Sequence, residues 1–290
     1  MLSELNQNKL IRLRDHFDTI LMEGFQLIEE NNDKFDIYQS LFKRYIYCFE
    51  SVNTLLKNFG PNKKHRAHSI AIVLRASLLD YLTTIYLRTY LAEKIAGIEG
   101  ASDRYNEQIE KLTSEQIRRF LSVSSKDKKT ELYNHEKFCN LTDSLYQNFK
   151  YLFDDTKPIN YDHPSKSLKY KRDDDIKSYV IRDRLDNYSK NLEKINYLEV
   201  FSLYDLFSKY DHFGVASMTL EYIETDEICE NIFWSLFHLS DGLSFCVDLL
   251  KTETGSHSDF NKMFHEIDCL RGTVYTEALE LSDSYKRKFS

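Results

Sequence analysis

The stretch of sequence that decides the fold runs from His68 to Ala96 and reads HSIAIVLRASLLDYLTTIYLRTYLAEKIA. An α-helix advances about 100° per residue, so the side chains of this stretch can be placed around a helical wheel. Its apolar residues fall within one arc of about 180° and include Ile70, Leu74, Leu78, Leu79, Tyr81, Leu82, Ile85 and Tyr86. An apolar arc of this kind is typical of a helix that packs against a core. We therefore predict a central helix over 68–96.

One charged residue, Arg75, lies inside the apolar arc, between Leu82 and Tyr86. A buried guanidinium needs an acceptor, because it does not lose its proton and is costly to leave unpaired. Two interpretations are open. In the first, Arg75 pairs with a carboxylate on a neighbouring helix or extends to solvent along its methylene groups. In the second, it lines a cleft and binds a phosphate or carboxylate ligand. The polar sector of the same helix holds Ser77, Asp80, Thr84 and Arg88.

A basic run, NKKHRAH at 62–68, precedes the central helix. The first turn of a helix carries partial positive charge and unpaired N–H groups, so cationic side chains are unfavourable there unless an anion binds. A phosphate would supply that anion. The residues that would hold it are Lys63, Lys64, Arg66 and His68. The other interpretation is a solvated basic loop.

The composition favours long helices. The 290 residues are 42% hydrophobic and 29% charged, an ordinary balance for a globular protein with a substantial core. Only 8 glycines and 3 prolines interrupt the chain, whereas sheet-rich folds need many tight turns. We predict an all-α fold, a multi-helix bundle of eight to ten helices that forms a single domain over 1–290.

Charge and cysteine content narrow the class of protein. The net charge of −7 argues against broad, unselective binding of nucleic acid but leaves room for a local basic groove. The 5 cysteines are odd in number and include no C-x-x-C pair, so free thiols in a reducing cytoplasm fit best. The N-terminus lacks the features of a signal peptide, and polar residues interrupt the apolar windows near 70–96 and 228–250. We expect a cytoplasmic protein without a membrane span.

Apolar residues at helical spacing predict further helices on both sides of the central one. The predicted ranges are 2–30, 33–59, 102–122, 130–153, 176–214 with a break near Asn196, 226–251 and 256–289. The segment 154–175 has no period, contains two prolines and carries a basic patch followed by three aspartates. We predict a long surface loop there. Long loops are often functional or mobile, and a solvated insertion is the other interpretation.

A second notable stretch is FSLYDLFSKYDHFG at 201–214. Ser208 and His212 are one helical turn apart on its polar side, together with Asp205, and Gly214 is placed to end the helix. Histidine is the usual proton carrier near neutral pH, which makes His212 the best catalytic candidate. The alternative is a histidine that is merely exposed or hydrogen-bonded.

These two stretches carry a family resemblance. The R-x-x-x-x-D pattern of Arg75 and Asp80, combined with the later S-K-Y-x-H-F segment from Ser208 to Phe213, resembles a group of uncharacterised bacterial helical proteins. These are similar to the HEPN-like superfamily, many of whose members are ribonucleases or RNA-binding parts of defence and toxin systems. The resemblance covers about a tenth of the chain. It implies a HEPN-like helical core and a role in stress or phage defence.

The chain departs from the HEPN ribonucleases in one respect. Those enzymes carry arginine and histidine on one helix with four to six residues between them, and here the nearest pair, Arg12 and His16, has only three. The resemblance then implies either no activity or a site built from two helices, with Arg75 and His212 as the natural pair. In such a site His212 would act on a ribose 2′-hydroxyl, and Arg75 would stabilise the phosphate's developing charge.

Other chemistries are poorly represented. The sequence has no P-loop, no G-x-G-x-x-G, no H-E-x-x-H and no G-x-S-x-G. The ligand-type residues between His257 and Cys269 match no metal-binding spacing, so we expect no metal and no cofactor. Two functions stay open: a nucleic-acid-directed protein, catalytic or not, whose partner is RNA, and a non-catalytic helical interaction protein that binds a partner protein or forms a homodimer.

Overall fold

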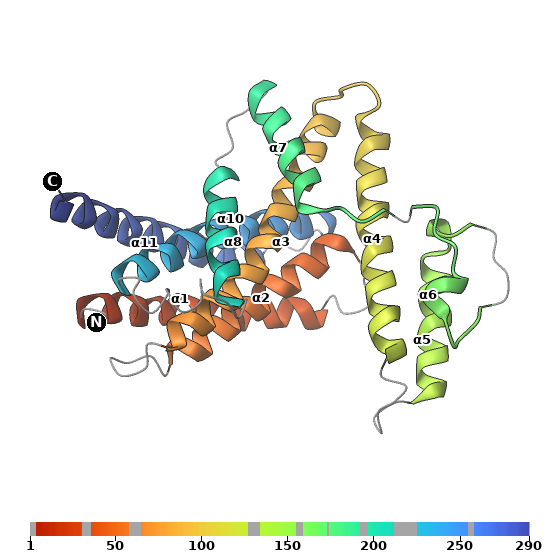
Figure 1. Cartoon of the computed structure of the whole chain (residues 1–290), viewed down its shortest axis with the longest axis horizontal. Helices are drawn as coiled ribbons and strands as arrows, with labels where there is room; N and C mark the ends of the chain where they lie inside the picture. Colours follow the sequence, from red (N-terminus) through yellow and green to blue (C-terminus); the bar gives the residue numbers. More distant parts are fainter. Residues whose placement is uncertain are drawn as a thin grey trace. The chain divides into compact units, whose positions relative to one another are not determined.

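The computed structural model describes residues 4–30, 36–57, 65–126, 134–154, 159–172, 174–191, 197–211, 225–254 and 258–289. In this part of the chain the fold is all-α, as the sequence predicts (Figure 1). Its α-helices are α1 (Glu4–Glu30), α2 (Ile37–Leu56), α3 (His65–Ile95), α4 (Ala101–Lys126), α5 (His135–Asn148), α6 (Pro164–Ser167), α7 (Ser178–Asn191), α8 (Tyr197–Asp211), α10 (Thr225–Thr254) and α11 (Ser258–Phe289), with a 3₁₀ turn η2 at Lys150–Leu152.

Local capping explains where two of the helices begin. The Asp36 carboxylate accepts hydrogen bonds from the backbone N–H groups of Tyr38 and Gln39, so α2 begins just after this aspartate. Asn134 does the same for the N–H of Lys137 at the start of α5. Both caps satisfy N–H groups that have no partner within the helix. Helix α2 therefore begins four residues later, and α5 five residues later, than the apolar period alone predicts.

The chain divides into two compact units, and the division falls inside α3. Unit 1 comprises 1–85 and 192–290, and unit 2 comprises 86–191. That the whole chain, 1–290, folds as a single domain stays a prediction.

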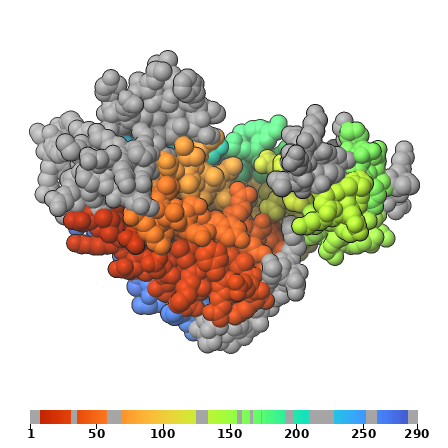
Figure 2. Space-filling model, turned by 90° about the horizontal axis from the view of Figure 1, so that it is seen from below, coloured from red at the N-terminus to blue at the C-terminus, as the bar shows by residue number. Residues whose placement is uncertain are grey.

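Unit 1 is built on four long helices. Helix α1 packs against α2 and α11, and α10 packs against α2 and α11, so the four helices close a ring around a shared core. Large side chains fill this core, and the rings of Phe17 and Phe49 lie 5.4 Å apart in it. Helix α8 packs against α10. Figure 2 shows α1 and α2 forming a continuous face of this unit.

Two glycines allow the helices of unit 1 to approach closely. A Cβ on Gly242 of α10 would overlap the hydroxyl end of Tyr45 on α2 and would lie 2.8 Å from Cδ2 of Tyr81 on α3. A Cβ on Gly24 of α1 would lie 2.5 Å from Cδ1 of Ile46 on α2. At Gly242 the obstacle is two rings held by their own hydrogen bonds, so this helix junction requires glycine.

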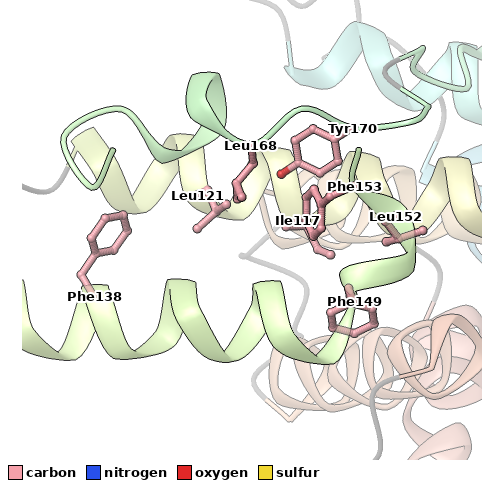
Figure 3. Packing of buried hydrophobic residues seen from close by; sticks show 8 residues of the cluster. All are labelled: Ile117, Leu121, Phe138, Phe149, Leu152, Phe153, Leu168 and Tyr170. Atoms are coloured by element: carbon pink, nitrogen blue, oxygen red, sulfur yellow. The ribbon is translucent and has the colours of Figure 1, made fainter. Parts of the chain in front are cut away.

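Unit 2 has a smaller core between α4, α5 and the chain that follows them. Figure 3 shows Leu168 and Tyr170 directed at the α4 side chains of Ile117 and Leu121, with Phe138 projecting from α5. Phe149, Leu152 and Phe153 complete the cluster. An isolated antiparallel bridge joins Phe153 to Tyr170, and no longer strand pairing occurs in the described residues.

The predicted loop at 154–175 contributes to this core. Its described part contains the short helix α6. The charges that follow α6 are paired with α4: Arg172 lies 3.5 Å from Glu107, Asp174 lies 2.9 Å from Lys111, and Asp175 lies 2.5 Å from Arg118. The described part of the segment therefore contributes Leu168 and Tyr170 to the core while its paired charges stay partly exposed, and the long surface loop over 154–175 stays a prediction.

Helix α3 is also the one helix in the described residues that is long and apolar enough to cross a membrane, over Ser69–Ile95. However, 67% of the window that passes this test is buried inside the protein, and buried core helices meet the same criterion. The expectation of no membrane span stays a prediction.

The close approach at Gly242 leads to a stability prediction. Gly242→Ala should lower the free energy of unfolding by about 1–3 kcal/mol, because the added methyl group forces two packed rings to move. Thermal and urea unfolding followed by circular dichroism would measure this change.

Gly272 of α11 provides the matched control, because a Cβ there meets no atom within 4 Å. Gly272→Ala should raise stability by up to about 1 kcal/mol, since alanine is the better helix former. Equal effects of the two substitutions would contradict the close-packing explanation.

Candidate functional site

Helix α3 is buried on two sides within unit 1. Its apolar arc faces the core, as predicted. The polar sector opposite is buried as well: Ser77, Asp80 and Thr84 are at most 6% exposed. Polar groups at this depth need partners, and neighbouring helices supply them.

Arg75 contacts helix α8. Its Nε donates a hydrogen bond to Ser208 Oγ at 3.0 Å, and its guanidinium carbon lies 5.6 Å from the centroid of the Tyr204 ring. Ser208 Oγ in turn donates to the Tyr204 carbonyl at 2.8 Å. The serine hydroxyl thus gives its proton to its own helix and accepts from Arg75. Sequence reasoning named both residues, and the fold brings them together; Ser208 fixes the direction of the guanidinium.

The contacts also give the direction of α8 relative to α3. At one end Arg75 meets Ser208. At the other, the Tyr81 ring lies 5.5 Å from the His238 ring of α10, whose Nε2 is 3.4 Å from Glu199 Oε2 of α8. Arg75, earlier in α3, meets Ser208, late in α8, whereas Tyr81, later in α3, lies on the side of Glu199, early in α8. The two helices therefore run antiparallel within unit 1 (Figure 1).

Asp80 belongs to a different contact. Arg44 of α2 binds it with two hydrogen-bonding groups, Nε to Oδ2 at 2.9 Å and the second amino group to Oδ1 at 2.8 Å. Five residues along a helix turn a side chain by about 140°, so Asp80 points away from the side that carries Arg75. Burial raises the pKa of Asp80 to about 6, although Arg44 acts in the opposite direction. Asp80 is thus a structural acceptor for α2 rather than a neighbour of Ser208.

The other predicted site residues are only partly described. His212 follows directly after the last residue of α8, and it lies outside the described residues, as do Lys63 and Lys64. Arg66 and His68 are in the first turn of α3, but their side chains are not among those described. The distance from Arg75 to His212 therefore stays a prediction.

Sequence reasoning missed a buried polar group around α10. His238 is 5% exposed, and its Nε2 makes no hydrogen bond although it lies within ion-pair range of Glu199. One turn further along, Asp241 accepts a hydrogen bond from the Tyr81 hydroxyl at 3.1 Å and lies 3.6 Å from Arg271 of α11. The available signal was a histidine and an aspartate inside an otherwise apolar helix, which sequence reasoning used only to argue against a membrane span.

The ligand-type residues between 257 and 269 do not form one cluster in the part that is described. His265 lies beside Cys269, whereas Glu266 turns toward His16 of α1, with 3.4 Å between Oε2 and Nδ1. Across the described residues, no three or more His, Cys, Asp and Glu side chains gather in a way that could hold a metal ion.

Comparisons with protein-family models, with curated proteins and with solved structures find nothing that matches the chain. The resemblance to the HEPN-like superfamily therefore stays a prediction. We therefore base the proposed function on the geometry of unit 1.

The raised pKa of Asp80 predicts a pH dependence of stability. The folded protein holds the Asp80 proton more tightly than the unfolded chain, in which the pKa is near 3.8. The stabilising contribution is thus fully present below about pH 4 and is lost as the pH rises to about 6. Asp80→Asn should remove this loss. The unfolding free energy of the wild type minus that of the variant should fall by about 1–3 kcal/mol between pH 4 and 7, as measured by urea denaturation.

Asp205→Asn is the control, because Asp205 is exposed on α8. It should leave the pH dependence of the wild type unchanged. If the wild-type and Asp80→Asn curves ran parallel, the assigned pKa of Asp80 would be wrong.

Proposed function

We propose that the protein is a nucleic-acid-directed helical protein that binds RNA and cleaves it without a metal ion, in a bacterial stress or phage-defence setting. The observation that carries the proposal is the contact between Arg75 and Ser208 in the last turn of α8, directly before His212. It joins the two sequence segments that resemble the HEPN-like superfamily.

The antiparallel packing of α3 and α8 adds support. Because α8 runs toward the N-terminal half of α3, its last turn ends on the side of unit 1 where α3 begins. The basic run at 62–68 leads into that end of α3. Phosphate binding at a helix N-terminus needs N–H groups and nearby cations. An RNA strand that uses this end would therefore meet cationic residues and the end of α8 together.

The chemistry assigned to the site is transesterification. His212 would accept the proton of a ribose 2′-hydroxyl while the 2′-oxygen forms a bond to the adjacent phosphorus. The bond from that phosphorus to the 5′-oxygen would break, and the 5′-oxygen would take up a proton. Arg75 would stabilise the negative charge that develops on the phosphate oxygens. The cyclic phosphate and the 5′-hydroxyl are the expected products.

Substitutions at the two residues test this site. In single-stranded RNA incubated with purified protein and EDTA, wild-type protein should produce fragments ending in cyclic phosphate. Arg75→Ala and His212→Ala should each slow cleavage at least about 10²-fold. His212→Ala should keep RNA affinity in a filter-binding assay, whereas Arg75→Ala should lose it.

The control is Arg12→Ala, which removes an exposed arginine elsewhere in unit 1. It should cleave and bind RNA as the wild type does. RNA binding and cleavage that survive unchanged in the Arg75→Ala/His212→Ala double variant would refute the proposal.

A second candidate function is supported by a different observation. Trp234 and Phe237 of α10 pack with Tyr275 of α11, with ring centroids 5.5–5.9 Å apart. Tyr275 is 44% exposed, and Leu279, one turn later, is 40% exposed. Partly exposed aromatic and aliphatic side chains are enriched at protein interfaces. They favour a helical interaction protein that forms a homodimer through α10 and α11.

This second function makes its own prediction. Light scattering during gel filtration should show a dimer for the wild type and a monomer for Tyr275→Ser/Leu279→Ser, because the substitutions remove apolar area from the interface. Met22→Ser, on an exposed position of α1 at 56% exposure, is the matched control and should stay dimeric. A wild-type monomer at every concentration tested would exclude the homodimer.

A further inference from the structure

The cysteines fall into two groups that differ in environment. Cys48, Cys229 and Cys246 are buried, whereas Cys139 and Cys269 are partly accessible. Burial raises the pKa of Cys48 to about 12, which keeps that thiol protonated and unreactive. The two accessible thiols are therefore the ones available for chemistry with solvent species.

Each accessible cysteine has a histidine one helical turn before it. The sequence reads HEKFC at 135–139 in α5 and HEIDC at 265–269 in α11, so the pattern H-E-x-x-C occurs twice. Residues four apart lie on the same face of a helix. The spacing matches that of H-E-x-x-H zinc helices, with cysteine in place of the second histidine.

The atoms that would bind a metal already face each other. The distance from Cys139 Sγ to His135 Nε2 is 3.6 Å, and that from Cys269 Sγ to His265 Nε2 is 3.7 Å. A tetrahedral zinc ion with Zn–S of about 2.3 Å and Zn–N of about 2.0–2.1 Å separates its sulfur and nitrogen ligands by about 3.5–3.6 Å. The separation of sulfur and nitrogen in each pair thus matches two corners of a tetrahedral site.

Ligand chemistry selects the kind of ion. A thiolate and an imidazole favour zinc and similar soft divalent cations over Mg²⁺ or Ca²⁺, which prefer oxygen ligands. Binding replaces the thiol proton, because only the thiolate coordinates the metal, so one proton is released for each ion bound. No third ligand of the usual types joins either pair in the described residues. Water would fill the remaining positions of a bound ion.

We propose that His135 with Cys139, and His265 with Cys269, form two accessible two-ligand binding sites for Zn²⁺. The two sites belong to different units, since 135–139 lies in unit 2 and 265–269 in unit 1. They are separate from the residues assigned to RNA and do not depend on that function. This proposal departs from the expectation, based on sequence spacing alone, that the chain binds no metal.

Cobalt substitution tests the proposal directly. Reduced, metal-free full-length protein is titrated with Co²⁺, and the near-ultraviolet absorption of cobalt–thiolate bonds is recorded. The wild-type protein should show a saturable band that Zn²⁺ abolishes. Cys139→Ser and Cys269→Ser should each lose about half of its amplitude, and the double variant should lose all of it. His135→Gln and His265→Gln should weaken Co²⁺ binding at least tenfold at their own site.

Alkylation of the unaltered chain gives a second measurement that does not require a substitution. Saturating Zn²⁺ should slow the reaction of iodoacetamide with Cys139 and Cys269 at least tenfold, as mapped by mass spectrometry. Mg²⁺ should have no effect. The proposal is overturned if the wild type gives no cobalt–thiolate band, if the band persists in the double cysteine variant, or if Zn²⁺ leaves both alkylation rates unchanged.

Discussion

The close approach of α10 to α2 and α3 at Gly242 is the constraint on which unit 1 depends. Without a side chain at this position, the backbone of α10 lies against the rings of Tyr45 and Tyr81. Each ring is then held by its hydroxyl, Tyr45 with Thr84 at 2.8 Å and Tyr81 with Asp241 at 3.1 Å. Three helices are fixed by apolar contact and by hydrogen bonds at the same place, so a change in spacing would break both.

This junction gives α3 two different faces. Toward α2 it presents the buried carboxylate of Asp80, which the half-exposed side chain of Arg44 binds. Toward α8 it presents Arg75, held by Ser208 and the Tyr204 ring. Removing one partner of a buried charged group leaves that group unpaired, so the contact constrains how the two helices meet. We therefore interpret Asp80 as the residue that fixes α3 on α2, and Arg75 as the residue that fixes the end of α8 where the proposed RNA site begins.

Some polar side chains of this protein form contacts that stabilise the fold, whereas others lie on accessible helix faces. In unit 2, Arg172, Asp174 and Asp175 form ion pairs with α4 while staying partly exposed, and the apolar residues Leu168 and Tyr170 before them belong to the core. The His–Cys pairs of α5 and α11 differ, because each histidine lies on an exposed helix face within 3.6–3.7 Å of a partly accessible cysteine sulfur. The function of a charged residue thus cannot be read from sequence until its partners are known. A histidine and a cysteine one helical turn apart, by contrast, lie on the same helix face, so the sequence already brings their ligand atoms close together.

The sequence by itself determined the all-α class, the approximate span of each long helix and the apolar arc of α3, because periodic burial and scarce glycine and proline act locally. It also placed Arg75 in the apolar arc and Ser208 one turn before His212. Only the tertiary structure decided which polar residues are buried: Asp80 and Thr84 lie on the side that looks solvent-exposed on a helical wheel, and α2 covers that side. The resemblance suggested that Arg75 meets the helix that leads to His212, but the particular contact, Arg75 with Ser208 and the Tyr204 ring, was decided by how whole helices pack. No local pattern records that packing.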